Sequence, residues 1–233
     1  ADFPGLFERA PLALAPGSSL YGLVPGDWIS GYIAFTGQYE AKLSAEITDL
    51  ARKGSLFVDV GANMGYFSVL WAAAQPSNRV IAFEASPRVV PLIQRNIAEN
   101  GLQDQITLVA KAASDRAGVV KFDTGPAEQT GWGGISDSET GVEVPAVRID
   151  EELAGRDIAV LKIDVEGAEF MVLQGCEGLL REKRIARIYF EYNGERAALL
   201  NSDNSDVVGF LNGFGYQCRS FDNNPNEWVA IPA

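Results

Sequence analysis

Short runs of β-branched and aromatic residues alternate along this chain with segments in which apolar residues recur every three or four positions. Runs of the first kind are typical of strands covered on both faces, and segments of the second kind of amphipathic helices. The alternation predicts an α/β fold: a mostly parallel sheet with right-handed crossovers and helices on both faces. Five runs predict the strands of the core sheet: residues 55–60, 79–83, 106–110, 158–163 and 187–190.

The predicted helices have recognisable start and stop signals. Ser86-Pro87 looks like an N-cap followed by proline at the first helical position, and Asn100-Gly101 looks like the end of that helix. Near the end of the chain, two extended segments predict an antiparallel hairpin that turns across residues 223–226. Two other helices are predicted over residues 38–51 and 65–74. A third follows residue 166 and is broken at Gly175, and a fourth is centred on residues 207–214.

Residues 1–36 keep neither a helical nor a strand period for long, and they predict short strands and turns. This segment is predicted to be an N-terminal arm, or a cap over a ligand pocket, and two interpretations of its aromatic residues are open. Its aromatic residues pack on the core, or they form a wall of a substrate pocket. The rest of the chain, residues 37–233, is predicted to form a single domain of ordinary size.

A long loop, residues 124–140, joins two segments that look extended, residues 118–123 and 141–149. Glycine-bearing loops of this length at a sheet edge often act as lids. Trp132 in this loop has two possible roles. It shields a reaction from water or stacks on a substrate, or it anchors the loop.

The segment from Phe57 to Phe67 reads as a strand, a glycine loop and the first turn of a helix, which is typical of a nucleotide-type binding site. Asn63 stands where the second glycine of a dinucleotide fingerprint would approach a diphosphate. Asp59, at the strand tip, would repel a diphosphate but attract an ammonium group. Glu84, 25 positions later, is suited to accept hydrogen bonds from ribose hydroxyls. These features favour S-adenosylmethionine over NAD, and the alternative is a tight turn beside two surface acids.

Several candidate residues are predicted at the carboxyl ends of strands, where open α/β sheets bind their ligands. Glu40 lies at the N-terminus of the helix predicted over residues 38–51, and either faces the methionine end of the cofactor or favours the helix N-terminus through the dipole. Ala112 either floors an adenine pocket or belongs to a tight bend. The residues predicted at strand ends are Asp59, Glu84, Ala112, Asp164 and Glu191.

Composition narrows the function. The chain has 233 residues, a net charge of −12 and no histidine. The charge disfavours a nucleic-acid partner, and the lack of histidine excludes Ser-His-Asp and Cys-His catalysis and His-ligated zinc. Cys176 and Cys218 are expected to be reduced. Because neither a membrane-spanning stretch nor a secretion signal is apparent, we expect a cytoplasmic protein.

Four motifs resemble the FkbM-type family of class I methyltransferases that use S-adenosyl-L-methionine (SAM). They are the segment 57–67, Phe83-Glu-Ala-Ser-Pro87, Val147-Arg-Ile-Asp150, and Leu161-Lys-Ile-Asp-Val-Glu-Gly-Ala-Glu169 followed by Val172-Leu-Gln-Gly175. The resemblance implies a Rossmann-like, seven-stranded sheet and methyl transfer from SAM, usually to a hydroxyl oxygen. It also implies cofactor contacts: the methionine end at Asp59, Gly61, Asn63 and Gly65, the ribose at Glu84, and the adenine at Ser86 and Ala112.

A hydroxyl acceptor must lose a proton, and without histidine the base is a carboxylate or a lysine. Asp164 is the first candidate because it is predicted beside the sulfonium of SAM, and Glu191 is the second. Glu166 and Glu169 come third because both are also suited to capping a helix. Lys162 is the lysine candidate, although it is equally suited to pairing with an acid. No metal is expected, since a hard cation needs more oxygen ligands than can be placed.

Trp132 and Tyr192 are the predicted substrate contacts. The acceptor is expected to be a hydroxylated small molecule, such as a sugar, a natural-product alcohol or a hydroxy-acid. Two alternatives stay open: a SAM-binding module without activity, and an NAD(P)-dependent reductase. The oligomeric state is also open.

Overall fold

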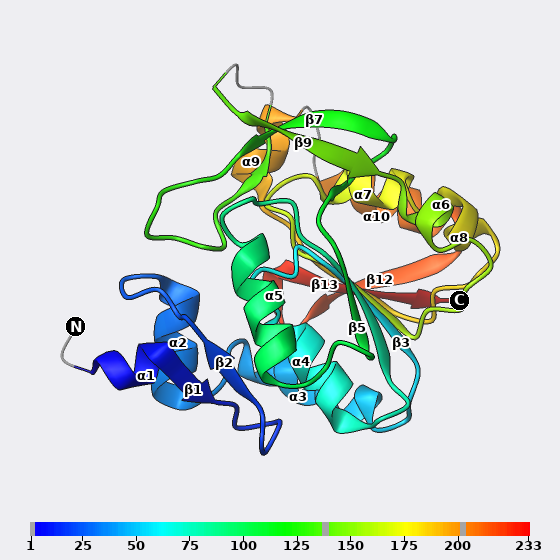
Figure 1. The fold of residues 1–233 in the computed structure, drawn as a ribbon. Coiled ribbons are helices and arrows are strands. Elements are labelled where there is room, and N and C mark those ends of the chain that lie inside the picture. Colours follow the sequence, from blue (N-terminus) through cyan, green and yellow to red (C-terminus); the bar gives the residue numbers. More distant parts are fainter. Residues whose placement is uncertain (1–2, 137–139, 201–203) are drawn as a thin grey trace.

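A central seven-stranded sheet organises the computed structural model, which describes residues 3–136, 140–200 and 204–233 (Figure 1). The strand order is β12-β13-β11-β10-β3-β4-β5. The five strands from β11 to β5 are parallel, and β13 runs antiparallel to both of its neighbours. The predicted mostly parallel sheet with a C-terminal antiparallel hairpin is therefore confirmed. The strands are β3 (Leu56–Val60), β4 (Arg79–Phe83), β5 (Ile106–Val109), β10 (Val160–Ile163), β11 (Ile188–Glu191), β12 (Tyr216–Phe221) and β13 (Asn224–Pro232).

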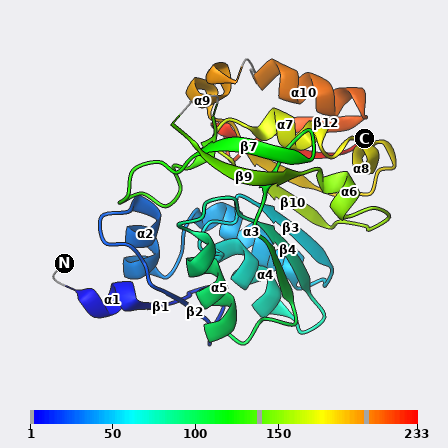
Figure 2. The same cartoon turned by 45° about the horizontal axis from the view of Figure 1, so that its top comes forward.

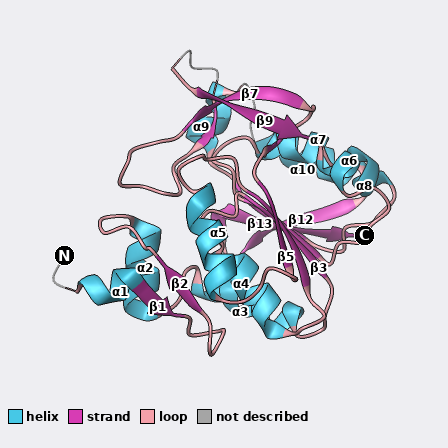
Figure 3. Ribbon diagram, viewed as in Figure 1, coloured by secondary structure: helices cyan, strands magenta, loops and turns pink. Residues whose placement is uncertain are grey.

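Helices cover both faces of the sheet, as the alternating pattern predicts (Figure 3). Along β3, Phe57 packs with the helices of one face, while Val58 and Val60 pack with those of the other. This alternation buries an apolar layer on each side of the sheet. None of the helices in the described part of the chain has the length and apolar character needed to cross a bilayer. The helices are α3 (Ala41–Ala51), α4 (Tyr66–Ala74) and α5 (Val90–Glu99) on the first face, and α6 (Ile149–Glu152), α7 (Glu169–Gln174), α8 (Glu177–Arg181) and α10 (Asn204–Gly213) on the second.

A second, four-stranded sheet follows β5, in the order β6-β9-β7-β8. It consists of β6 (Ala112–Ala113), β7 (Gly118–Asp123), β8 (Gly134–Ile135) and β9 (Val142–Val147). The two extended segments predicted from the sequence are β7 and β9. The predicted loop between them contains β8, which is too short to show a period, and residues 137–139 of that loop lie outside the described residues.

The N-terminal arm differs from its prediction, because its longest element is a helix. The arm contains α1 (Pro4–Glu8), β1 (Arg9–Pro11), β2 (Ser19–Tyr21) and α2 (Trp28–Thr36). Asp27 caps α2 by accepting a hydrogen bond from the Ser30 amide, and Gly37 ends it in a left-handed conformation. Exposed aromatic residues and buried aliphatic ones share this helix, so the sequence shows no apolar stripe. The arm also packs against the helices rather than directly on the sheet, since the Tyr21 amide donates to Asn96 of α5 (Figure 1).

Two further boundaries differ from prediction. The helix predicted from Ser86-Pro87 begins at Val90, because the Ser86 carbonyl accepts bonds from the Val89 and Val90 amides and forms a separate turn. The hairpin between β12 and β13 turns at Asp222-Asn223, where both residues have positive φ, rather than across residues 223–226. Such a pair of left-handed residues suits a two-residue hairpin turn. A short helix that the sequence did not predict, α9 (Gly194–Leu199), follows β11.

Candidate active site

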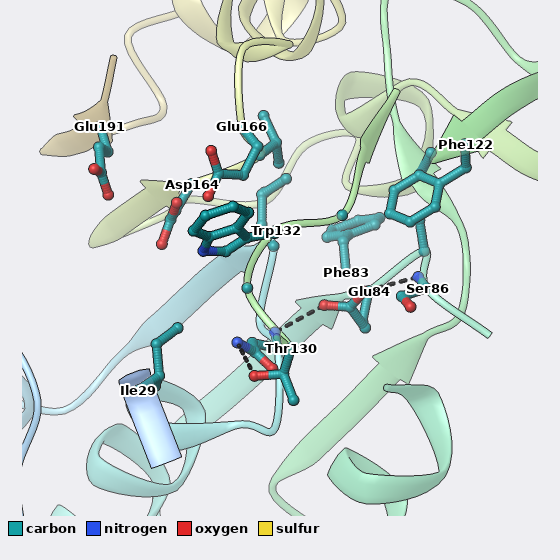
Figure 4. A pocket seen from close by; sticks show the side chains of 18 of the residues that line it. Ile29, Phe83, Glu84, Ser86, Phe122, Thr130, Trp132, Asp164, Glu166 and Glu191 are labelled. Atoms are coloured by element: carbon teal, nitrogen blue, oxygen red, sulfur yellow. Dashed lines mark hydrogen bonds between the residues drawn. The ribbon is translucent and has the colours of Figure 1, made fainter. Parts of the chain in front are cut away.

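A cavity of about 270 Å³ lies at the carboxyl ends of the central strands (Figure 4). The strand order reverses between β3 and β10, and open α/β sheets bind ligands outside such a reversal. The glycine loop after β3, the residues that follow β4 and β10, and Glu191 at the end of β11 line the cavity. Helix α2, the loop before β8 and the second sheet complete its walls.

Gly61 allows the ends of β3 and β10 to meet at this place. Its φ is +77°, and an added Cβ would lie 1.8 Å from the Asp164 carbonyl oxygen. Only glycine tolerates both the left-handed backbone and this close approach. Gly65 also has a positive φ and precedes α4, but its Cβ position faces Ile93 rather than the cavity.

At one end of the cavity, main-chain amides hold the carboxylate of Glu84. The Asn63 amide donates to Oε2 and the Ser86 amide to Oε1, each at 2.8 Å (Figure 4). Glu84 is buried, and this burial raises its pKa to about 7 although the amides act in the opposite direction. Each carboxylate oxygen keeps a second lone pair that can accept a hydroxyl.

Two polar side-chain atoms at this end have no partner within the described part of the chain: Asn63 Oδ1 and Ser86 Oγ. Both residues line the cavity, and both atoms are buried. Buried polar atoms in proteins are nearly always hydrogen-bonded, so such orphans mark where a ligand supplies the missing partner. Together with Glu84, they fit the hydroxyls and ring nitrogens of an adenosine.

At the other end, three carboxylates gather around a buried lysine. One oxygen each from Glu40, Asp164 and Glu191 lies within 4.8 Å of the others, and Lys162 Nζ lies 2.9 Å from Asp164 Oδ2. Burial acts to lower the pKa of Lys162, but Asp164, Glu40 and Asp59 together raise it. Burial, followed by the charges of Asp164 and Glu40, raises the pKa of Glu191 well above its ordinary value.

The carboxylate cluster suits an organic cation better than a divalent metal. Ca²⁺ and Mg²⁺ take six or more oxygen ligands, and the Lys162 ammonium already occupies part of the coordination space of Asp164. The acids outnumber the lysine, so a further positive charge is favoured there. An ammonium or sulfonium group meets that condition.

Comparison with known proteins decides the family. A family model described as "Methyltransferase FkbM domain" matches residues 59–218, which is more than half of the chain. The chain belongs to the FkbM methyltransferase family. It is therefore a methyltransferase, and the predictions of the family, of the class I fold and of SAM as cofactor are confirmed.

Individual relatives are distant. The 31-O-demethyl-FK506 methyltransferase FkbM of Streptomyces tacrolimicus is 27% identical over 199 residues, which cover 71% of this chain and 74% of the relative. The methyltransferase sdnD of Sordaria araneosa is 27% identical over 154 residues, 52% of this chain and 60% of that protein. The crystal structure of methyltransferase FkbM from Methylobacillus flagellatus KT aligns with a TM-score of 0.54 at 15% identity, covering 98% of this chain but only 57% of that one. This last likeness shows the fold alone.

The structure brings many of the predicted site residues of this FkbM-family chain to the main cavity. They come from the glycine loop, from the ends of four strands and from the loop before β8. The lining residues that the sequence predicted are Gly61, Asn63, Glu84, Ser86, Ala112, Trp132, Asp164, Glu166 and Glu191.

Other predicted residues do not line the main cavity. Strand alternation turns Asp59 toward α4, where its Oδ2 accepts a hydrogen bond from Ser68 at 2.6 Å. Glu40 and Lys162 line a smaller hollow of about 20 Å³ that shares Asp164 and Glu191 with the main cavity. Tyr192 follows β11 and lines neither space, and its amide donates to the Asn226 carbonyl.

Two aromatic residues of the N-terminal arm, Trp28 and Tyr32 of α2, line the cavity, as one of the two interpretations of that arm expects. Thr130 of the loop also lines it, and the sequence did not single this residue out. Thr130 carried no signal, since its role depends on a contact with Asn63 across 67 residues of chain.

Proposed function

We propose that this chain transfers the methyl group of SAM to a hydroxyl oxygen of a small molecule. One observation carries the proposal: Asp164 and Glu191 line the same cavity as Glu84 and Ser86. Proton-accepting carboxylates therefore share one space with the groups that suit the donor. The name of the Streptomyces relative also supports it, since that protein is named for a substrate lacking a methyl group on an oxygen.

At the donor end, we assign the ribose hydroxyls to Glu84 and the rim of the adenine to Ser86 and Ala112. Asn63 and Gly61 hold the methionine part through the glycine loop, and Asp164 and Glu40 face its ammonium group. SAM, when bound, supplies a methyl group on a positively charged sulfur. The role of this chain is to hold that sulfur and the acceptor oxygen in line.

At the acceptor end, we assign Asp164 as the general base and Glu191 as its alternative. As the new oxygen–carbon bond forms, the carboxylate takes the hydroxyl proton. Because burial raises the pKa of Glu191, this residue is a suitable base near neutral pH. Lys162, whose pKa is raised, stays protonated and positions Asp164 rather than acting as a base.

A methyl-transfer assay with labelled SAM and a panel of hydroxylated compounds tests this function. We expect Asp164→Asn to lower kcat at least about 100-fold, and Glu191→Gln about tenfold, with smaller changes in SAM affinity. Asp104→Asn, at an exposed site, is the matched control. Transfer to nitrogen or carbon acceptors alone would overturn the oxygen assignment, and unchanged turnover in both acid variants would overturn the base assignment.

The class of acceptor and the cellular compartment are part of the same proposal. The net charge of −12 supports a small-molecule acceptor over a nucleic acid, because phosphate backbones require a basic surface. Both cysteines, Cys176 and Cys218, are free thiols, which supports a reducing compartment such as the cytoplasm.

A further inference from the structure

The mouth of the cavity carries three exposed aromatic side chains. Trp28 is 69% exposed and Tyr32 is 53% exposed, and their spacing of four residues puts them on one face of α2. Trp132, in the loop before β8, is 51% exposed. All three line the cavity, whereas Phe35, 61% exposed on the same helix, does not. Exposed aromatic residues concentrated at a cavity mouth mark a binding surface.

A single buried carboxylate holds these aromatics in place. Asp27 Oδ2 accepts hydrogen bonds from the Ser30 amide at 2.9 Å and caps α2. The same side chain accepts from the Thr130 amide and hydroxyl, each at 3.1 Å. The loop runs beside helix α2 (Figure 2), and these bonds join the two into one unit. The aromatic positions are therefore preorganised.

The second end of the loop is fixed as well. The Trp132 carbonyl accepts a hydrogen bond from Arg196 Nη1 at 2.8 Å. Arg88 Nη2 donates to the Gln129 carbonyl at 3.0 Å. With its backbone fixed on both sides, Trp132 presents its ring from a defined position.

The charges around the cavity disfavour an anionic ligand. Four acids line it: Glu84, Asp164, Glu166 and Glu191. Among the described residues that line it, the cationic side chain is Lys111, which pairs with Glu152 at 3.2 Å. An acceptor with a phosphate or carboxylate group would find no unpaired cation among the described lining residues to bind it, because Lys111 pairs with Glu152 and the buried Lys162 pairs with Asp164.

We propose that Trp28, Tyr32 and Trp132 form the acceptor platform, and that the acceptor is an uncharged hydroxylated molecule with an apolar body. The platform holds the apolar body while the hydroxyl reaches Asp164. We expect phosphorylated sugars, nucleotide-linked sugars and carboxylated acceptors to bind weakly, because the described lining offers their anionic groups no unpaired cation. This inference rests on the proposed function.

Three probes that share one linkage chemistry test the platform. Octyl β-D-glucoside is uncharged and has an apolar chain, octyl β-D-glucuronide carries a carboxylate in the same frame, and methyl β-D-glucoside lacks the chain. Each is titrated below its micelle concentration into protein saturated with S-adenosylhomocysteine, with calorimetry and tryptophan fluorescence as readouts. We expect saturable binding of the octyl glucoside, and binding of the other two weaker by about tenfold or more.

Variants separate the platform from general adsorption of an apolar chain. Trp28→Ser and Tyr32→Ser should each weaken octyl glucoside about five- to tenfold, while Trp28→Phe retains most of the affinity. Phe35→Ser removes an equally exposed aromatic from the same helix and should have no effect. The affinity for S-adenosylhomocysteine should change less than about twofold in all four.

The outcomes distinguish the two proposals. Failure of the wild-type protein to bind S-adenosylhomocysteine contradicts the proposed function itself. If S-adenosylhomocysteine binds normally, three results would each overturn the platform alone. Octyl glucoside does not bind, the glucuronide binds equally well, or Phe35→Ser has the same effect as Trp28→Ser.

Discussion

The two ends of the cavity hold their acids in different ways. At the donor end, two main-chain amides meet the charge of Glu84. At the acceptor end, where we also place the methionine ammonium group, Glu40, Asp164 and Glu191 depend on the side chain of Lys162. The first arrangement needs only the neighbouring strands β3 and β4 with the loops that follow them, whereas the second needs α3, β10 and β11 to be assembled in the correct order. The donor end is therefore a local structure, and the acceptor end is a product of the whole fold.

This difference predicts different consequences of mutation. Removing a carboxylate from the donor end leaves amide donors that water or a ligand can satisfy. Removing the lysine from the acceptor end leaves several acids close together and partly shielded from water. This change should lower the free energy of unfolding more than the first.

Lys162→Met should therefore have the largest effect. Loss of the ammonium leaves Asp164 and its neighbours without a buried counter-charge, and we expect the free energy of unfolding to fall by about 3–5 kcal/mol. Urea denaturation measures it. Lys111→Met is the matched control, because that lysine is exposed and pairs with Glu152 at the surface. If both variants were equally stable, the cluster would not depend on the lysine.

Glu84→Gln should have the next largest effect, on binding rather than on folding. The amide side chain keeps the shape of the site but offers one acceptor oxygen to the ribose hydroxyls where the carboxylate offers two. We expect SAM affinity to fall about 10- to 100-fold, measured by calorimetry. Glu128→Gln, in an exposed loop, should bind SAM like the wild type. A Glu84 variant with unchanged affinity would remove this residue from the ribose site.

The same contrast explains what the sequence could predict. Asn63, Glu84 and Ser86 could be predicted to lie at one cavity, because the strand with its glycine loop and the end of the next strand are each visible in the sequence. The gathering of Glu40 with Glu191 was less predictable, because Glu40 adopts a left-handed conformation, with φ of 43°, that no local signal specifies. Helix α2 was missed because its aromatic residues point outward, so burial and hydrophobicity do not coincide there.

Stability should fall as the pH rises, because the acids are buried in an environment that favours their neutral forms. Burial raises the pKa of Glu84 and of Glu169 from 4.5 to about 7. At pH values between 4.5 and about 7, the folded protein keeps protons on these two side chains that the unfolded chain has already lost. Protonation therefore stabilises the folded state at the acidic end of this pH range. We expect each of these two groups to lower the free energy of unfolding by roughly 2–3 kcal/mol between pH 5 and pH 8.

Chemical denaturation at several pH values measures this slope. Glu84→Gln removes one titrating group and should flatten the curve, whereas Glu128→Gln should leave it unchanged. A protein that became more stable between pH 5 and pH 8 would contradict the assignment of buried, neutral acids.

The smallest effect should come from Thr130→Val, which acts on the connection between the donor end and the acceptor platform. The Thr130 hydroxyl donates to Asp27 and accepts from Asn63 Nδ2 at 3.2 Å, so it joins the loop to the glycine turn. Valine keeps the shape but loses both bonds, which should cost about 1 kcal/mol of stability and weaken SAM binding less than about threefold. Thermal denaturation and calorimetry measure the two effects, with Thr107→Val on the exposed side of β5 as control. A loss of SAM affinity as large as that of Glu84→Gln would show that the two ends are coupled through this hydroxyl and are not independent.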